Sequence, residues 1–232
     1  VTSVGNSTFE YCGALTSVTI PNSVTSIGGE AFQYCSSLTS VTIPYGVTCI
    51  KYGTFDQCTS LTEVIIPNTV TSIESHAFSQ CSELIKITIP NGVTHIGERA
   101  FYGCFDMVGI KIPKSLTSMD SGAFMYCQSL TEVVIPGSLK NIPEDAFFVC
   151  NELAEVVISD GVESIGESAF GGAEKLKKII IPGSVKSIEN EAFYGSQIED
   201  LTISDGVESI GEEAFAYNRI RNLTISDSVT DI

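Results

Sequence analysis

The sequence predicts a single repeat solenoid. Its 23-residue coils would stack in a right-handed sense, in an α/β repeat class rich in β-structure, with a parallel sheet on one face. Two observations predict this fold: phenylalanine recurs at a fixed interval along the whole chain, and each interval repeats the same alternation of apolar and polar residues. A domain with one central core does not produce such a period, whereas stacked repeats do.

Ten phenylalanines mark the period. The first nine are 23 residues apart and the tenth follows after 22: Phe9, Phe32, Phe55, Phe78, Phe101, Phe124, Phe147, Phe170, Phe193 and Phe215. Copies of the unit L-T-x-V-x-I-P-x-x-V-T-x-I-G-x-x-A-F-x-x-C-x-x begin at Leu15, Leu38, Leu61, Leu84, Met107, Leu130, Leu153, Leu176, Ile198 and Ile220. Residues 1–14 match the tail of an earlier copy, and the last copy stops at Ile232. We expect one domain over residues 1–232 with ten copy starts, a fragment or processed chain cut within a repeat at both ends.

The first part of each unit is expected to be a strand. In the copy that begins at Leu15, Val18 and Ile20 alternate with polar residues, so they face one side of a pleated strand. Pro21 cannot donate a hydrogen bond to a neighbouring strand, so it ends this one. The V-T-x-I segment that follows, residues 24–27, is expected to form a second short extended piece.

The second part of the unit is expected to turn and close the coil. Gly28 opens the turn, and the x-x-A-F-x-x-C segment after it is shorter than the roughly 12–15 residues that an independent helix needs. We predict a single helical turn there, packed by Ala31 and Phe32. Acidic side chains near its start would compensate the helix dipole; they are Glu144, Asp145, Glu167, Glu212 and Glu213.

Each coil depends on its neighbours, because one coil cannot bury its own apolar face. Stacking makes the inward positions of successive copies into a continuous core. The phenylalanine column would contribute most, at roughly 1.5–3 kcal/mol for each buried side chain. Charges of alternating sign in adjacent coils support this register, as at Glu163, Lys186 and Glu208.

The combination of Pro, Gly, Ala-Phe and Cys at fixed offsets resembles the BspA-like leucine-rich-repeat family over essentially the whole chain. The resemblance implies a leucine-rich-repeat solenoid and a secreted or cell-surface protein. Several members of that family are similar to adhesins that bind host matrix proteins or other cells, and the family has no fixed catalytic residues. The chain departs from the pattern where Pro is replaced, at Ser159, Ser204 and Ser226, and where Cys is replaced, at Ala173, Ser196 and Asn218.

Seven cysteines share one position of the repeat: Cys12, Cys35, Cys58, Cys81, Cys104, Cys127 and Cys150. We expect them to be free, buried thiols, because Cys packs as a small hydrophobe and Ala, Ser or Asn replaces it in later copies. Some disulfide or a metal site stays open as an alternative, since stacked coils would place neighbouring Cα atoms about 4.8 Å apart. The side chains would run parallel, however, and no C-x-x-C pair is present. Cys49 lies off the column and is expected to be more exposed.

No catalytic constellation is visible. The two histidines, His76 and His95, lie at different offsets in adjacent repeats, and no zinc-protease, nucleophile-elbow, phosphate-loop or dinucleotide motif is present. We therefore predict that the protein is not an enzyme and uses no cofactor and no metal. Aspartates in the S-D-G and S-D-S turns could bind calcium, but an Asp that bonds its own turn explains them more simply; they are Asp160, Asp205 and Asp227.

Charge and hydropathy limit the partners. The chain has 12 Lys and Arg against 28 Asp and Glu, a net charge of −16. Such a surface repels phosphate backbones, so nucleic acid is not expected as a partner. No stretch approaches the roughly 18 apolar residues of a membrane helix, so no membrane insertion is expected. With the family resemblance, this predicts a monomer that is extracellular or at the cell surface.

One part of the sheet face departs from the Ser- and Thr-rich pattern. The third and fifth positions of each copy point outward, and there the sequence places two glutamates side by side, which costs stability, next to an apolar strip. A locally broken rule indicates a candidate site, although Val and Ile are also common in strands. The predicted binding face consists of Glu132, Val134, Glu155, Val157, Lys178 and Ile180.

Two functions from different classes remain open. The first is a non-enzymatic extracellular binding or adhesion module, whose extended face contacts a protein partner of a host matrix or of another cell surface. The alternative is a structural spacer that projects a flanking domain from the cell surface. Exposed side chains that break the period favour binding, and the candidate face is the one place where they gather.

Overall fold

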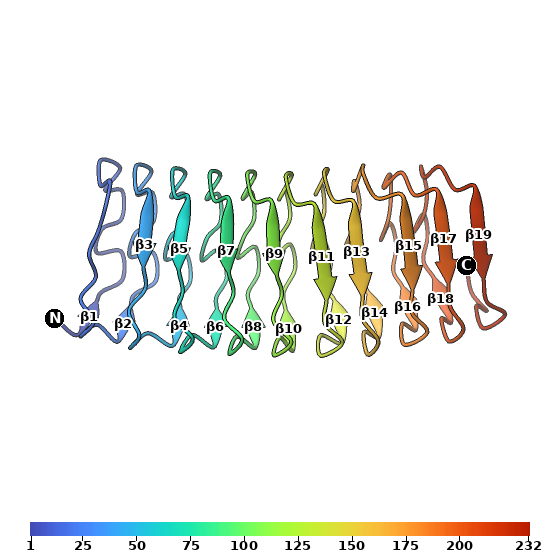
Figure 1. Cartoon of the computed structure of the whole chain (residues 1–232), viewed down its shortest axis with the longest axis horizontal. Coiled ribbons are helices and arrows are strands. Elements are labelled where there is room, and N and C mark those ends of the chain that lie inside the picture. The colour runs from blue at the N-terminus through green and yellow to red at the C-terminus, as the bar shows by residue number, and fades with distance from the viewer.

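The computed structural model describes residues 1–232 as one elongated stack of coils, with the two termini at opposite ends (Figure 1). The near strands run downward while the stack advances to the right, and the chain returns behind them, so the coil is right-handed. The regular elements are nineteen short strands and no helix. The structure also contains no helix that is long and apolar enough to cross a membrane. The predicted solenoid is confirmed, with all of its regular structure in strands.

The main face is a row of parallel strands, one for each coil. The strands are β3 (Ser40–Thr42), β5 (Glu63–Ile65), β7 (Lys86–Thr88), β9 (Gly109–Lys111), β11 (Glu132–Ile135), β13 (Glu155–Ile158), β15 (Lys178–Ile181), β17 (Asp200–Ile203) and β19 (Asn222–Ile225). Hydrogen bonds join them into three ladders, β3-β5-β7-β9, β11-β13 and β15-β17-β19. The copy that begins at Leu15 forms no regular strand here, so the row has nine strands, one fewer than the copies.

The predicted second extended piece forms a second row of parallel strands. Each of its strands has two residues: β1 (Ser3–Val4), β2 (Ser26–Ile27), β4 (Cys49–Ile50), β6 (Ser72–Ile73), β8 (His95–Ile96), β10 (Ser118–Met119), β12 (Asn141–Ile142), β14 (Ser164–Ile165), β16 (Ser187–Ile188) and β18 (Ser209–Ile210). In both rows equivalent residues of paired coils lie side by side, so each position of the repeat becomes a column along the axis.

The prediction of a helical turn around each Ala-Phe pair is wrong. The residues two before and two after each of the ten periodic phenylalanines have positive φ, as at Glu30 (58°) and Tyr34 (59°), which no right-handed helix allows. Alternate N–H groups of the segment bond to the next coil: the Phe32 N–H donates to the Thr54 carbonyl at 2.9 Å, and the Tyr34 N–H to the Asp56 carbonyl at 2.9 Å. The N–H groups between them close turns within the segment, as from Gln33 to the Glu30 carbonyl at 3.1 Å. Because the next coil offers a carbonyl to these alternate N–H groups, a third row of bonds between coils forms in place of a helix.

The helix-dipole explanation of the acidic residues is therefore also wrong. Glu144 and Asp145 precede a turn that has no helix and no dipole of its own. Partial burial and the neighbouring Glu144 carboxylate raise the pKa of Asp145. A helix N-terminus would instead favour the charged form and lower it.

The positive φ at Val149 gives a stability prediction. Val149 has a φ of 57°, a conformation that costs L-residues about 1–2 kcal/mol and suits β-branched residues least. We expect Val149→Gly to raise the free energy of unfolding by about 0.5–1 kcal/mol, measured by chemical denaturation. Val134→Gly is the matched control: it makes the same chemical change in strand β11, where Gly weakens the strand, and should lower stability. A loss at both positions would contradict the strain at Val149.

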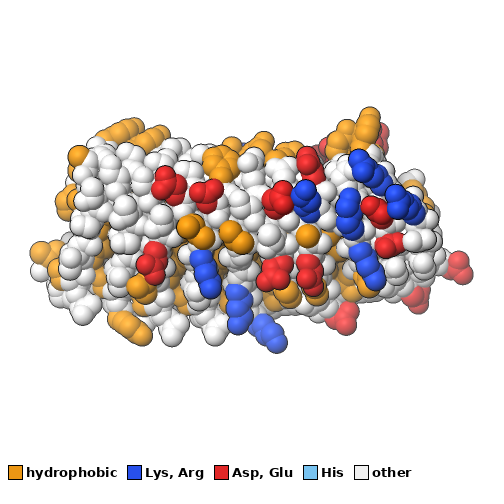
Figure 2. All heavy atoms as spheres, turned by 45° about the horizontal axis from the view of Figure 1, so that its top comes forward, with side chains coloured by type: hydrophobic (Ala, Val, Ile, Leu, Met, Phe, Trp, Pro, Cys, Tyr) orange, Lys and Arg blue, Asp and Glu red, His pale blue; other side chains and the backbone are white.

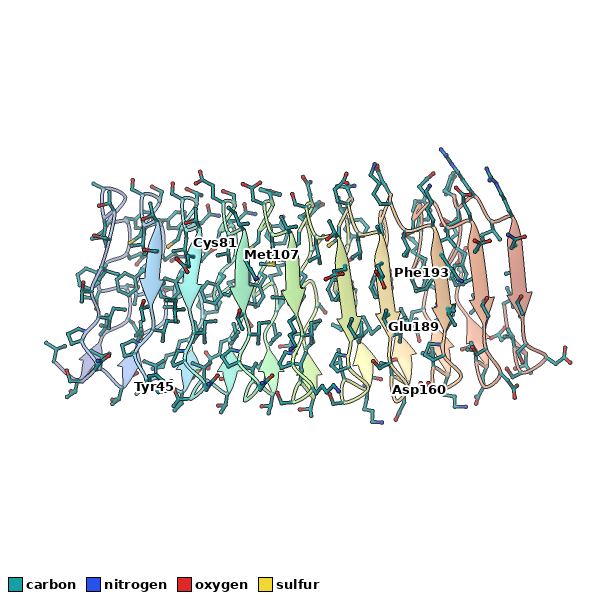
Figure 3. The ribbon with its side chains drawn as sticks, viewed as in Figure 1. Tyr45, Cys81, Met107, Asp160, Glu189 and Phe193 are labelled. Atoms are coloured by element: carbon teal, nitrogen blue, oxygen red, sulfur yellow. The ribbon has the colours of Figure 1, made fainter.

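The phenylalanines form a continuous column in the core. Those of the interior coils are completely buried: Phe32, Phe55, Phe78, Phe101, Phe124, Phe147, Phe170 and Phe193. Neighbouring rings are stacked with centroids 5.1–5.5 Å apart. At the two ends, Phe9 is 37% exposed and Phe215 is half-buried. Figure 3 shows equivalent side chains repeating along the stack, with Phe193 and Cys81 labelled.

The cysteine column is confirmed as buried free thiols in its six interior members, while Cys12 at the end is exposed and Cys49, off the column, is half-buried. Each interior thiol donates to the carbonyl of the phenylalanine 26 residues earlier, as from Cys81 Sγ to Phe55 O at 3.2 Å. The Ser196 hydroxyl makes the same bond to Phe170 O at 2.7 Å, and the Asn218 amide donates to Phe193 O at 2.7 Å. The position thus favours a small side chain that can donate, which explains these two replacements.

Candidate binding face

The six residues of the predicted face lie on β11, β13 and β15, and all six side chains are exposed. Glu132 pairs with Glu155 and Val134 with Val157 as direct neighbours across the parallel ladder. The alternate residues of the same strands, such as Val133, point inward and are buried. The period of two therefore places the charged and apolar side chains on the outer surface, as predicted.

The charges of this face have no partners within the chain. Seven ion pairs are present in the structure, and none of them includes Glu132, Glu155 or Lys178. Elsewhere the predicted alternation of sign does produce ion pairs, such as the one between Lys186 Nζ and Glu208 Oε1 at 3.3 Å. Glu132 and Glu155 are thus like charges on adjacent strands, and neither forms an ion pair with a cation of the chain.

The apolar members of the face are half or nearly half exposed: Val134 at 54%, Val157 at 43% and Ile180 at 51%. Sequence reasoning missed two further exposed aliphatic residues, Ile85 and Val108, at 52% and 49%. Both occupy the second position of the repeat, where the neighbouring copies have Thr. That departure from the consensus was the signal that could have found them.

The threonines of the second position have a structural role. The Thr62 hydroxyl donates to the Thr39 carbonyl of the preceding coil at 3.1 Å, and the Thr131 hydroxyl donates to the Val108 carbonyl at 3.2 Å. A side chain that satisfies a backbone carbonyl in this way needs no external partner. Ile85 and Val108 cannot make the bond, so they add only apolar surface to the main row, beside β7 and β9.

A groove of about 690 Å³ crosses β9, β11 and β13. Three of the six predicted residues line it: Glu132, Val134 and Glu155. Two lysines that were not predicted, Lys111 and Lys114, also line it. Val157, Lys178 and Ile180 lie outside this groove. Figure 2 shows basic and acidic side chains next to one another over this part of the surface, with apolar side chains around them.

The structure brings together one group of residues that resembles a catalytic arrangement, away from this face. His95 Nδ1 lies 3.3 Å from Ser118 Oγ, and His95 Nε2 lies 3.7 Å from an Asp120 carboxylate oxygen. The Asp120 contact is longer than a hydrogen bond, and the Ser118 side chain is exposed on the second row of strands. The groove beside Asp120 does not include Ser118 or His95.

No group of three or more His, Cys, Asp or Glu side chains is arranged to hold a metal ion. Of the three turn aspartates, Asp205 has a side-chain hydrogen bond: its Oδ1 accepts from the Ser226 hydroxyl of the next coil at 3.0 Å. This bond joins two coils and is not the bond to its own turn backbone that the sequence predicted.

Known proteins that are similar to this chain have the same solenoid fold, and one family model matches the chain. The model of the BspA-type leucine-rich-repeat region, which spans six copies, matches residues 2–131 and again 117–232. No curated protein is significantly similar in sequence. A leucine-rich-repeat protein from Bacteroides ovatus is 29% identical with a TM-score of 0.84, over 100% of this chain and 66% of its own. The chain therefore spans slightly less than two thirds of that relative.

Two further solved structures are similar. A leucine-rich cell-surface protein from Faecalibacterium prausnitzii is 33% identical with a TM-score of 0.60, over 98% of this chain and 70% of its own. The leucine-rich-repeat protein of T. pallidum is 30% identical with a TM-score of 0.68, over 75% of this chain and 82% of its own. The protein from Faecalibacterium prausnitzii is described as a cell-surface protein, and all three proteins come from bacteria.

Proposed function

The chain belongs to the BspA-type leucine-rich-repeat family, and on this premise we propose that it is a non-enzymatic module that binds a protein partner outside the cell. The partner is a protein of a host matrix or of another cell surface. The chain contacts it through the binding face of Glu132, Val134, Glu155, Val157, Lys178 and Ile180. Location at the cell surface is supported by the similar protein of Faecalibacterium prausnitzii, which is described as one.

The observation that carries the proposal is the unpaired charge beside exposed aliphatic side chains. The fifth position elsewhere in the main row is mostly Thr, as at Thr42, Thr88 and Thr202, whereas it is Val or Ile in this face. Several second-position Thr hydroxyls are used within the stack. Glu132 and Glu155 repel each other, and Val134 is 54% exposed, so this face is less favourable in water than its neighbours. A partner that supplies cationic and apolar groups would relieve both costs.

Charge reversal on this face tests the proposal. The purified full chain is applied to immobilised matrix proteins and to whole cells, and bound protein is measured against concentration and salt. We expect Glu132→Lys with Glu155→Lys to weaken binding by about tenfold or more, because two attractive contacts become repulsive. Binding of the parent should also weaken as salt rises, since exposed charges are screened over about 8 Å at physiological ionic strength.

The matched control is Glu212→Lys with Glu213→Lys. This variant changes the net charge by the same amount, but in the exposed turn before Phe215, outside the binding face. It should bind as the parent does. Equal binding by the parent and both variants would rule the proposed face out, and equal losses in both variants would show attraction by net charge alone.

A structural spacer is the second candidate. The regular Ser and Thr columns favour it, because hydroxyls that bond to the preceding coil stiffen the stack without creating a site. A spacer predicts that the full chain binds neither matrix proteins nor cells above background, at any salt concentration. Saturable binding of the parent would exclude a pure spacer.

A further inference from the structure

The groove across β9, β11 and β13 carries charges of both signs, and we infer that it holds an extended segment of the partner with an acidic, an aliphatic and a basic side chain at alternate positions. This inference rests on the proposed function and names the chemistry that the face recognises. The acidic side chain faces Lys111 and Lys114, and the basic side chain faces Glu132 and Glu155.

The lining of the groove supports an apolar centre between two charged sides. Ile110, Ile112 and Val133 are almost fully buried at its floor, and Val134 is 54% exposed at its wall. An aliphatic side chain that covers Val134 would remove apolar surface from water on both partners. The volume of about 690 Å³ is in the range of cavities that enclose a small ligand or a few residues of a chain.

The charged sides are free to bind a partner. None of the seven ion pairs of the chain includes Lys111, Lys114, Glu132 or Glu155. All four side chains are exposed. No internal ion pair has to break before a ligand carboxylate or guanidinium binds. The charge-assisted hydrogen bonds to the ligand therefore replace only hydrogen bonds to water.

The spacing of the charges selects an extended segment. Lys111 lies one coil before Glu132 and two coils before Glu155, and it is two positions further along its strand. With about 4.8 Å between strands and about 3.3 Å for each residue, the Cα atoms are roughly 8–12 Å apart. In an extended peptide, residues on one side recur about every 6.6 Å, so three successive ones span about 13 Å. Lysine and glutamate side chains are flexible enough to adjust to the difference between these two distances.

A short synthetic peptide tests this pattern. The probe is an acetylated and amidated heptapeptide with Asp at its second position, Ile at its fourth, Arg at its sixth and Thr elsewhere. Its dissociation constant for the full chain is measured by chemical-shift titration. We expect it to bind about tenfold more tightly than the same peptide with Asn and Gln in place of Asp and Arg. A peptide with Arg at both charged positions should bind as weakly as the neutral one.

Charge exchange in the protein gives the sharper result. Lys111→Glu with Lys114→Glu, and separately Glu132→Lys with Glu155→Lys, should each weaken the peptide by about tenfold. All four substitutions together keep the net charge and keep both signs in the groove. An extended peptide can lie in the reverse direction, so this variant should bind within about threefold of the parent. Lys111→Gln with Lys114→Gln should also weaken binding, without introducing new repulsion.

Three results would overturn the inference. The Asp and Arg peptide could bind no more tightly than its neutral version, or the doubly basic peptide could bind as tightly as the Asp and Arg peptide. The variant with all four substitutions could also bind as weakly as the variants in which only the lysines or only the glutamates are exchanged. Denaturation midpoints equal to the parent show that each variant is folded. The proposed function is separable from this inference. Glu132→Lys with Glu155→Lys could lose matrix or cell binding while the chain binds the charged and neutral peptides equally. In that case the proposed binding face stands, and the inference that the groove holds a segment with both charges is wrong.

Discussion

Replacing Phe101 with Ala is expected to lower the free energy of unfolding by about 3–5 kcal/mol, the usual range for a buried aromatic side chain. The Phe101 ring is completely buried and stacks on both sides, with centroids 5.4 Å from Phe78 and 5.1 Å from Phe124. Its removal leaves a cavity in the centre of the column. Because every coil is held only by its neighbours, the loss weakens the interface on both sides of the cavity.

The same substitution at the ends of the column should cost roughly half as much, because a partly exposed side chain loses less on removal. Phe9 is 37% exposed and stacks only on Phe32, and Phe215 is half-buried and stacks only on Phe193. Urea denaturation of the three variants measures the difference. Equal losses at all three positions would contradict a stack held by nearest neighbours.

Thiol labelling should separate the cysteines by orders of magnitude in rate. The thiolate is the reactive form, and burial raises the pKa of Cys35 to about 11 and of Cys150 to about 12. For Cys35 alone, this lowers the thiolate fraction near neutral pH by about a hundredfold. Burial also blocks the reagent, so interior cysteines should react only when the stack opens.

In the native protein we expect Cys12 to react fast and Cys49 more slowly. Cys12 is exposed, whereas Cys49 is half-buried and its thiol donates to Glu74 Oε1 at 3.0 Å. Burial is the main cause that raises the pKa of Cys49. All eight cysteines should react in denaturant, and the intact mass should show no disulfide. Fast labelling of Cys81 or Cys104 in the native protein would contradict the buried column.

The strands and the core could be predicted from the sequence because they depend on local periods. Alternation of two places Val133 inside and Val134 outside, and the interval of 23 brings equivalent residues side by side. The neighbouring glutamates Glu132 and Glu155 follow from the same arithmetic. A one-residue error in register would have exchanged every inward and outward side chain, so these predictions were tightly constrained.

The third side of the coil could not be predicted, because its conformation is set between coils. Ala, Phe and Cys at its inner positions look like one apolar turn of a helix. Of the twenty positions two before or two after the ten periodic phenylalanines, only five are glycine, although all twenty have positive φ. Residues such as Glu30 and Val149 give no local signal for that conformation. The hydrogen bonds of the third row between coils impose it.

The groove was missed for a related reason. Lys111 and Lys114 belong to the coil before Glu132, and their side chains join its wall only through the packing of neighbouring coils. In the sequence, Lys111 is at the fifth position of the repeat and Glu132 is at the third, so they belong to different columns. The structure brings their side chains to one groove. The groove therefore adds two lysines to the glutamates and the apolar strip that the sequence analysis identified.

Photocrosslinking to the bound partner tests the central claim most directly. A photoreactive residue is placed at position 157, next to the groove, or at position 213, in the turn before Phe215. Each variant is saturated with the matrix protein that binds the parent and then irradiated. We expect covalent adducts from position 157, near Val134 and Glu155, and only background from position 213. Adducts from position 213 with none from position 157 would place the partner on another side of the coil and contradict the account.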